Sequence, residues 1–342
     1  MSSHPSPRVT SASLQPARDE EPYGELDPQV AALFQLLKAR GMPREPEALR
    51  SMDSLTALGL ASYACAVASQ QTIHVPGPRG PVRAVVYQPG PPESGPYPVL
   101  VYFHGGGYVF GGPESYAHLT TQICMDARAV VVSVDYRLAP EHPYPQPLED
   151  CLACVRWLRQ HAQLLQGDPE RIGFVGDSAG GNAAVCVALL LRDAGEPAPA
   201  SLALLCPWLD MTLTSESYQR FAPHDPMMGE GGMLLLLSSY LRGHPATDPR
   251  VSPVLAELHG LPESLIVVGE IDPLYSDGVT FARKLQQHGG TAHLRSYRGM
   301  PHNFACLPFI DVAKESRGEV QRFHERVLAK RGEPLSASPA RR

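Results

Sequence analysis

The sequence predicts an α/β fold with a mostly parallel central sheet, helices on both faces and an added helical cap. Two observations support this prediction: short, nearly continuous apolar runs recur along the chain, and helical stretches lie between them. Strands that are buried on both faces of a parallel sheet produce such runs. The alternation of strand and helix through most of the 342 residues indicates a doubly wound sheet.

Two helical segments are expected near the N-terminus. Asp27 and Pro28 precede an apolar face and Gly41 ends it, which is the pattern of a capped helix. A weaker helical run covers residues 49–60, and residues 25–75 are therefore predicted to form the N-terminal part of the cap. The Ser- and Pro-rich residues 1–24 and the final residues 331–342 are predicted to be solvated tails.

The core of the α/β fold is expected in residues 76–210 and 250–330. Its expected strands are the segments 81–90, 97–103, 129–138, 171–178, 201–208, 265–273 and 292–299, and its expected helices are 148–165, 181–191 and 278–288. The alternation breaks in residues 211–249, which are rich in Met, Leu, Gly and Pro and contain a helical run near 233–241. Insertions after parallel strands tend to cover sites, so this segment is predicted to complete the cap.

Composition limits the partners of the chain. The formal net charge is −6 and no stretch is densely basic, which argues against nucleic acid as a partner. No apolar run approaches the roughly 20 residues that cross a bilayer, so stable membrane insertion is not expected. The chain has 13 scattered histidines without a paired ligand spacing, and no metal or cofactor is expected.

Cysteine usage predicts a cytoplasmic location. The chain has seven cysteines, an odd number, and its first residues lack the apolar core of an export signal. Cys151 and Cys154 form a C-x-x-C pair inside an expected helix, with no second ligand pair in view. We expect these two thiols to pack as small buried side chains.

The stretch GFVGDSAGG places Ser178 between a predicted strand and a predicted helix. Gly176 and Gly180 complete the pattern G-x-S-x-G, which is typical of a nucleophile on a sharp strand-to-helix turn. Side chains two positions before and after the serine would collide in such a turn. The alternative is a glycine-rich turn with an incidental serine.

A serine hydroxyl needs a base, and the base needs a group that orients it. Asp272 follows the apolar run LIVVGEI, and His302 follows the last expected strand, so the order Ser, Asp, His fits the expected order of partners. Nearby competitors are Glu270, Asp277, His288 and His293. Glu270 lies almost within the strand, the two histidines are expected at the surface, and Asp277 is expected to cap a helix.

The segment His104-Gly105-Gly106-Gly107 follows another expected strand. Consecutive glycines let main-chain N–H groups point into a pocket, where they can bind an oxyanion, and the N–H of Ala179 adds a further donor. A phosphate cradle would need a following Gly-Lys-Ser/Thr or a dinucleotide spacing, and neither is present.

Together these motifs resemble the hormone-sensitive-lipase-like group of α/β-hydrolases, the bacterial family IV esterases. The resemblance rests on HGGG at 104–107, YRLAPEHPYPQPLED at 136–150, GDSAGG at 176–181, DPL at 272–274 and GMPHNF at 299–304. It covers about residues 27–330.

The resemblance implies a serine carboxylesterase that acts on small esters with short to medium acyl chains, without a cofactor. It implies Ser178, Asp272 and His302 as the catalytic triad, and Gly106, Gly107 and Ala179 as the oxyanion donors. His104 and Gly105 would support the oxyanion loop. The family also makes a homodimer possible.

Two departures from the family pattern concern the cap and its neighbourhood. Ser276 stands where an acidic residue is usual, and MLLLLSSY replaces an aromatic- and acid-rich run. Substrate-pocket candidates, chosen by position beside the motifs, are Tyr108, Trp208, Leu209 and Met233. An amidase or deacetylase using the same three residues stays open as an alternative, as does a non-catalytic receptor for a small molecule.

Overall fold

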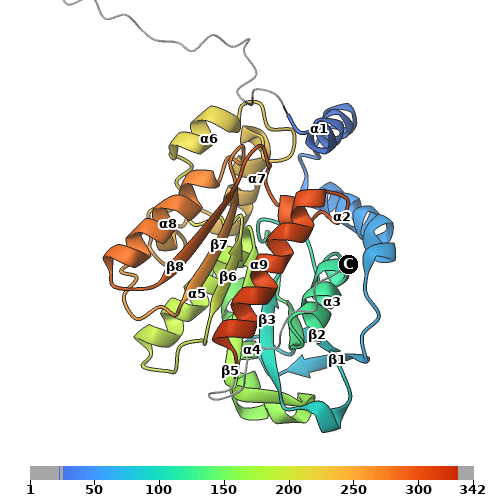
Figure 1. Cartoon of the computed structure of the whole chain (residues 1–342). Coiled ribbons are helices and arrows are strands. Elements are labelled where there is room, and N and C mark those ends of the chain that lie inside the picture. Colours follow the sequence, from blue (N-terminus) through green and yellow to red (C-terminus); the bar gives the residue numbers. More distant parts are fainter. Residues whose placement is uncertain (1–22, 24–25, 330–342) are drawn as a thin grey trace, which may run out of the picture.

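The computed structural model describes Tyr23 and residues 26–329, and in this part of the chain eight strands form one sheet. The strand order is β1-β2-β4-β3-β5-β6-β7-β8, and the ribbon in Figure 1 shows its strong twist. Strands β3 to β8 run parallel to their neighbours, whereas β2 is antiparallel to both β1 and β4. The parallel part of the sheet places the ends of β3, β5, β7 and β8 along one edge.

The strands between the two edge strands β1 and β8 are largely buried on both faces, as the apolar runs predict. Their bounds are β1 Ser69–Val75, β2 Val82–Gln88, β3 Tyr97–Phe103, β4 Val130–Asp135, β5 Gly167–Asp177, β6 Leu202–Leu205, β7 Ser264–Gly269 and β8 Ala292–Tyr297. All six residues of β7 are buried. The edge strand β8 has none that is fully buried.

Helices cover both faces of the sheet. Their bounds are α1 Pro28–Arg40, α2 Pro46–Leu60, α3 Ala117–Asp126, α4 Gln146–His161, α5 Ala179–Asp193, α6 Glu216–Phe221, α7 Glu230–Leu241, α8 Tyr275–Gln287 and α9 Asp311–Val327. One buried apolar cluster joins α4, α5 and α8 to the sheet, and a second joins α3 and α9 to it. The molecule therefore has the three layers of a doubly wound α/β fold.

The structure confirms the expected order of strands and helices and adds elements that the sequence reading lacked. Asp27 caps α1 through a hydrogen bond from the Gln29 amide, and Gly41 ends the helix with φ 69°. Strand β1 was not expected, because its sequence SQQTIHV is polar and its side chains are mostly exposed. Residues 69–75, which the expected boundary gives to the cap, therefore belong to the sheet.

The helices outside the three layers lie at one end of the sheet. Figure 1 shows α1, α6 and α7 at the top and α2 at the upper right, above the ends of the central strands. The expected tails, residues 1–24 and 331–342, lie outside the described residues except for Tyr23. No described helix is both long and apolar enough to cross a membrane.

Candidate active site

Ser178 lies on a sharp turn between the end of β5 and the start of α5. Its backbone has φ 51° and ψ −119°, a strained conformation for a residue with a side chain. A Cβ on Gly176 would lie 2.3 Å from the Gly180 carbonyl oxygen, and a Cβ on Gly180 would lie 1.9 Å from that of Phe103. The expected collisions on either side of the serine are therefore confirmed.

The structure brings Ser178, His302 and Asp272 into one chain of hydrogen bonds. The Ser178 hydroxyl lies 3.0 Å from Nε2 of His302, and Nδ1 of His302 lies 2.9 Å from a carboxylate oxygen of Asp272. A carboxylate only accepts, so Nδ1 carries the proton and Nε2 is left free to accept from the serine. The other Asp272 oxygen accepts from the Leu274 amide at 2.8 Å, which fixes the carboxylate.

The surroundings of His302 favour its protonated form. Burial lowers the pKa of the imidazole, but the charge and hydrogen bond of Asp272 and the charges of nearby carboxylates together outweigh burial, and the net pKa is raised. The carboxylates of Asp225 and Asp177 act in the same direction. This arrangement suits a base that becomes an imidazolium during the reaction.

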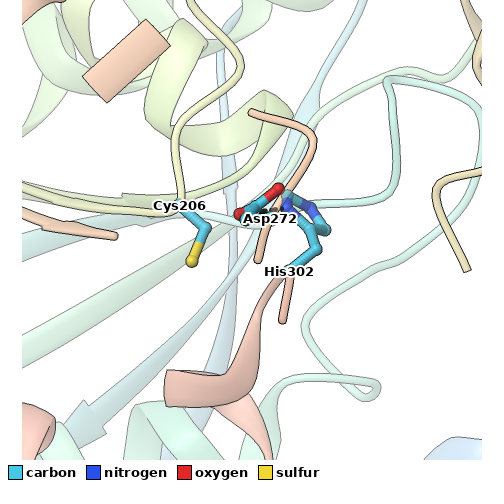
Figure 2. A group of neighbouring side chains, drawn as sticks. All are labelled: Cys206, Asp272 and His302. Carbon is cyan, nitrogen blue, oxygen red and sulfur yellow. Dashed lines mark hydrogen bonds and ion pairs between the residues drawn. The ribbon is translucent and has the colours of Figure 1, made fainter. Parts of the chain in front are cut away.

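Cys206 lies beside the same carboxylate. Figure 2 shows Asp272 between Cys206 and His302, and the ligand atoms of the three residues lie within 4.8 Å of one another. Burial and the charge of Asp272 raise the pKa of the Cys206 thiol well above its ordinary value, whereas a metal binds the thiolate. Because both ring nitrogens of His302 are already engaged, the group fits a hydrogen-bonded pair with a neutral thiol better than a metal centre.

The glycine segment after β3 forms a tight turn beside Ser178. Gly106 and Gly107 have φ 105° and 61°, and both line the same cavity as Ser178 and His302. His104 is fully buried, and burial lowers its pKa to about 4, so the ring is neutral. Its Nδ1 lies 2.7 Å from the Gly105 carbonyl oxygen, to which it donates. Ala179 begins α5 directly after the serine.

Asp177 joins the nucleophile turn, the glycine loop and the histidine loop. Its carboxylate accepts from the Gly105 amide at 2.9 Å, from the Tyr102 hydroxyl at 2.6 Å and from the Asn303 side-chain amide at 2.9 Å. Asn303 follows His302, and Asp177 precedes Ser178. One buried carboxylate therefore fixes the positions of the three segments relative to one another. The sequence reading missed this role, although both residues lie inside the motifs GDSAGG and GMPHNF.

A mostly apolar cavity of about 180 Å³ opens onto Ser178. Its walls include Leu49, Asp53, Leu60, Trp208, Met227, Met228, Met233, Leu236 and Leu307. Two of the predicted pocket residues, Trp208 and Met233, line it. Met227 and Met228 were not predicted, because nothing in an irregular segment marks which side chains turn inward.

The other two predicted pocket residues, Tyr108 and Leu209, are absent from the cavity wall. The Tyr108 hydroxyl donates to Asn182 at 2.8 Å, and its ring stacks on Tyr240 at 3.9 Å, so the side chain points away from the cavity. Leu209 is buried, and its amide donates to Asp277 at 2.9 Å. Nearness to a motif in sequence therefore did not determine side-chain direction.

The competing residues have other partners. Glu270 accepts from the Ser296 hydroxyl, His293 lies 2.6 Å from Glu263, and His288 accepts from the Leu258 amide. Both histidines are half-buried rather than exposed.

Asp277 does not cap its helix as expected. It lies buried in the first turn of α8 and accepts from the Leu209 and Asp210 amides at 2.9 Å. Ser276, the departure from the family pattern, exchanges hydrogen bonds with Ser217 in α6. The change at the start of α8 is therefore local, and it joins α8 to the inserted segment.

The fold and this arrangement of a serine, a histidine and an aspartate define an α/β-hydrolase. The family model for the alpha/beta hydrolase fold matches residues 100–306. The chain is 38% identical over 248 residues to the carboxylesterase NlhH of Mycobacterium tuberculosis, which covers 70% of this chain and 75% of that protein. It is 32% identical over 303 residues to an ethyl acetate hydrolase of Pseudomonas putida, covering 83% of this chain and 93% of that protein.

Solved structures agree with the sequence comparison. The esterase of Pyrobaculum calidifontis superposes with a TM-score of 0.83 at 32% identity, over 88% of this chain and 98% of that one. The thermostable carboxylesterase EstE1, cloned from a metagenomic library, gives 0.81 at 34% identity, over 84% and 98%. The chain belongs to the hormone-sensitive-lipase-like family of α/β-hydrolases, the bacterial family IV esterases.

Proposed function

We propose that this protein is a serine carboxylesterase that hydrolyses small esters with short to medium acyl chains through an acyl-serine intermediate. The single observation that carries the proposal is the hydrogen-bonded order Ser178–His302–Asp272 at the floor of an apolar cavity. Membership in a family whose matched relatives are named as ester hydrolases supports the bond that is broken.

In the first half of the reaction, Ser178 attacks the ester carbonyl while Nε2 of His302 takes the hydroxyl proton. A bond forms between the serine oxygen and the carbonyl carbon, and the carbonyl electron pair moves onto its oxygen. The bond to the alcohol oxygen then breaks, and the imidazolium returns its proton to the leaving alcohol. Asp272 keeps the imidazole in the tautomer that this transfer needs.

In the second half, water replaces the alcohol. His302 takes a proton from the water, the hydroxide adds to the acyl carbon, and the second oxyanion collapses with release of the carboxylic acid. The same histidine protonates the departing serine oxygen. The two halves use the same three residues, so neither requires a cofactor.

The oxyanion in each half would be bound by the main-chain N–H groups of Gly106, Gly107 and Ala179. The support for this is the position of the two glycines on the cavity wall beside Ser178 and of Ala179 at the first turn of α5. The helix N-terminus also favours negative charge there. His104 and Gly105 would hold the loop without touching the substrate.

The cavity fits a small substrate. Its volume of about 180 Å³ lies below the roughly 300–1,000 Å³ of pockets that take drug-sized ligands. Its walls include residues of α2, of α7 and of the loop before α7, and we assign these segments to the cap. The cap then selects the acyl or alcohol group, and the sheet edge performs the chemistry.

Two further proposals concern the setting of the enzyme. The seven cysteines are all free, and six of them are buried, which supports a reducing compartment such as the cytoplasm; cell fractionation tests this. The edge strand β8 supports a homodimer formed by strand pairing, and light scattering in solution tests that assembly.

A series of p-nitrophenyl esters with acyl chains from acetate to decanoate tests the function, with the variant Ser178→Ala as the control. The wild type should hydrolyse the shorter esters and the variant should not. Equal rates for both would contradict the assignment of the nucleophile. A matched p-nitroanilide separates an amidase from an esterase, and a wild-type protein that binds ligands but resists a fluorophosphonate would indicate a receptor.

A further inference from the structure

The glycine loop beside Ser178 holds a backbone shape that the loop alone does not favour. Gly106, Gly107 and Tyr108 have φ 105°, 61° and 63° in succession, and Gly111 has φ 94°. Positive φ is costly for Tyr108 because it carries a side chain. Such a conformation persists only where surrounding contacts determine it, so the contacts that hold this loop matter for the chemistry.

Helix α2 supplies contacts of this kind through Arg50. Its Nε donates to the Val109 carbonyl at 2.9 Å, and Nη2 donates to the Ala139 carbonyl at 2.7 Å. Val109 belongs to the turn that starts at Gly106, since the Gly106 carbonyl accepts from the amides of Val109 and Phe110. Arg50 therefore fixes the far end of the turn that carries the expected oxyanion donors.

Asp53 lies one helical turn further along α2 and holds the next part of the same loop. Its carboxylate accepts from the Ser115 hydroxyl, and the nearby Gly111 backbone amide favours its ionised form. Residues three apart on a helix share one face, so Arg50 and Asp53 both form hydrogen bonds to the loop from the same face of α2. Asp53 also lines the substrate cavity.

We propose that Arg50 and Asp53 are positioning residues that hold residues 106–115 in the geometry that binds the oxyanion. The packing of helix α2 against this loop then completes the oxyanion hole. This proposal rests on the esterase function proposed above. It assigns to α2 a part in the chemical step in addition to its part in the cavity wall.

Glu141, the exposed ion-pair partner of Arg50, provides a control that distinguishes the positioning of the loop from the attachment of α2 to the rest of the protein. Glu141 forms a two-bond ion pair with Arg50, at 2.9 and 2.6 Å, and its side chain is 54% exposed. Exposed ion pairs contribute little to stability. The contacts of Arg50 with the two carbonyls, and not the ion pair, should therefore carry the effect, and Glu141→Gln is the matched control.

The test measures kcat and KM for p-nitrophenyl butyrate in Arg50→Gln, Asp53→Asn and Glu141→Gln. Loss of a single oxyanion donor lowers kcat by about 10²–10³. We expect a displaced loop in Arg50→Gln or Asp53→Asn to lower kcat by about 10-fold or more, with KM within about threefold, and Glu141→Gln to stay within about threefold of the wild type. A rise of KM at unchanged kcat, or an equal loss in Glu141→Gln, would overturn the proposal.

A transition-state analogue gives a second readout that a merely structural role would not move. A trifluoromethyl ketone forms a tetrahedral adduct with serine and needs the oxyanion hole, so its inhibition constant should rise by the factor by which kcat/KM falls. An unchanged inhibition constant in a variant with lowered kcat would contradict the proposal.

Folding and the proposed function are controlled separately. If Arg50→Gln does not fold, Arg50→Lys and the near-isosteric Asp53→Asn carry the same test, with thermal unfolding measured for each. If the wild type neither hydrolyses esters nor reacts with a fluorophosphonate, the proposed function fails. If the wild type is active and all the variants match it, only this inference fails.

Discussion

The edge of the sheet at the carboxyl ends of its parallel strands and the helices above this edge contribute to one site in different ways. At the sheet edge, each residue of the proposed triad follows a strand: Ser178 follows β5, Asp272 follows β7 and His302 follows β8. The part of the cavity wall that covers these groups comes instead from α2 and from residues of the segment 227–236. Groups at strand ends are placed by the backbone, whereas cavity walls are placed by packing between distant segments.

This difference predicts two kinds of mutational effect. Substitutions at the sheet edge should lower kcat for every ester, because they alter the chemical step. Substitutions in the covering segments should change which ester is preferred. Arg50 and Asp53 are the point at which the two regions meet, since they belong to α2 and hold the loop of the sheet edge.

The largest effect is expected from Asp272→Asn. The amide would accept less well from Nδ1 of His302 and would leave the imidazole in the wrong tautomer, so kcat should fall by about 10⁴ for all acyl lengths. Steady-state kinetics across the ester series measures this. A loss of kcat confined to the longer esters would contradict the distinction between the two regions.

A pair of glycine substitutions compares the same two regions in stability. Gly180→Ala places a Cβ 1.9 Å from the Phe103 carbonyl oxygen, so the free energy of unfolding should fall by about 1–3 kcal/mol or more, and activity should fall with it. Gly231 in α7 has open space around its Cβ position, and Gly231→Ala should stabilise by about 0.5–1 kcal/mol. Urea unfolding measures both, and similar values would contradict the geometry of the serine turn.

Asp177→Asn should have an intermediate effect. The substitution keeps the size of the side chain but weakens the acceptors for Gly105, Tyr102 and Asn303, which each lie within 2.9 Å of the carboxylate. Removing charge from such hydrogen bonds costs about 1.5–3 kcal/mol, so kcat should fall by about 10- to 100-fold with little change of KM. A rise of KM alone would mean that Asp177 acts on binding and not on the catalytic geometry.

In the covering helices, Met233→Ala should change selectivity. Met233 is fully buried and lines the cavity, so its truncation enlarges the space for an acyl chain. The ratio of kcat/KM for octanoate to that for acetate should rise by several-fold, while kcat for acetate changes little. The stability cost of about 2–5 kcal/mol is followed by thermal unfolding. A uniform loss for all esters would assign Met233 to the chemistry.

The smallest expected effect concerns pH. His302 must be neutral to take the serine proton. Its raised pKa therefore places the midpoint of the acid limb in the pH profile of kcat/KM above the ordinary imidazole value of 6.5. Burial raises the pKa of Asp225 to about 6, so this carboxyl is mainly ionised on that limb and favours the imidazolium. Asp225→Asn should move the limb to lower pH by a fraction of a unit, whereas the exposed Glu257→Gln should leave it in place. A limb at or below 6.5 in the wild type would contradict the raised pKa.

Sequence reasoning identified the sheet and the three residues that the structure joins by hydrogen bonds, Ser178, His302 and Asp272, because their signals are local. Alternation marks β2, apolar runs mark the strands β3 to β7, and the serine turn needs glycines at two fixed offsets, so these features can be predicted without coordinates. The polar edge strand β1 carries no such signal, and residues 69–75 were therefore placed in the cap.

The cavity wall and the supporting contacts could not be predicted in this way. Tyr108 lies next to the glycine segment, yet its hydroxyl reaches Asn182 in α5. Asp177 bonds to residues 72 to 126 positions away, and Asp53 to Ser115 across 62 positions. Direction of a side chain and contacts of this length depend on the packing of whole elements, which a single sequence does not encode locally.

The central claim is that the hydroxyl of Ser178 becomes acylated because His302 removes its proton. Mass spectrometry of the protein after reaction with a fluorophosphonate addresses this directly, with His302→Ala treated in parallel. We predict one adduct, on the peptide that contains Ser178, formed at least 10³-fold more slowly in His302→Ala. An adduct on a different residue, or equal rates in the two proteins, would contradict the account.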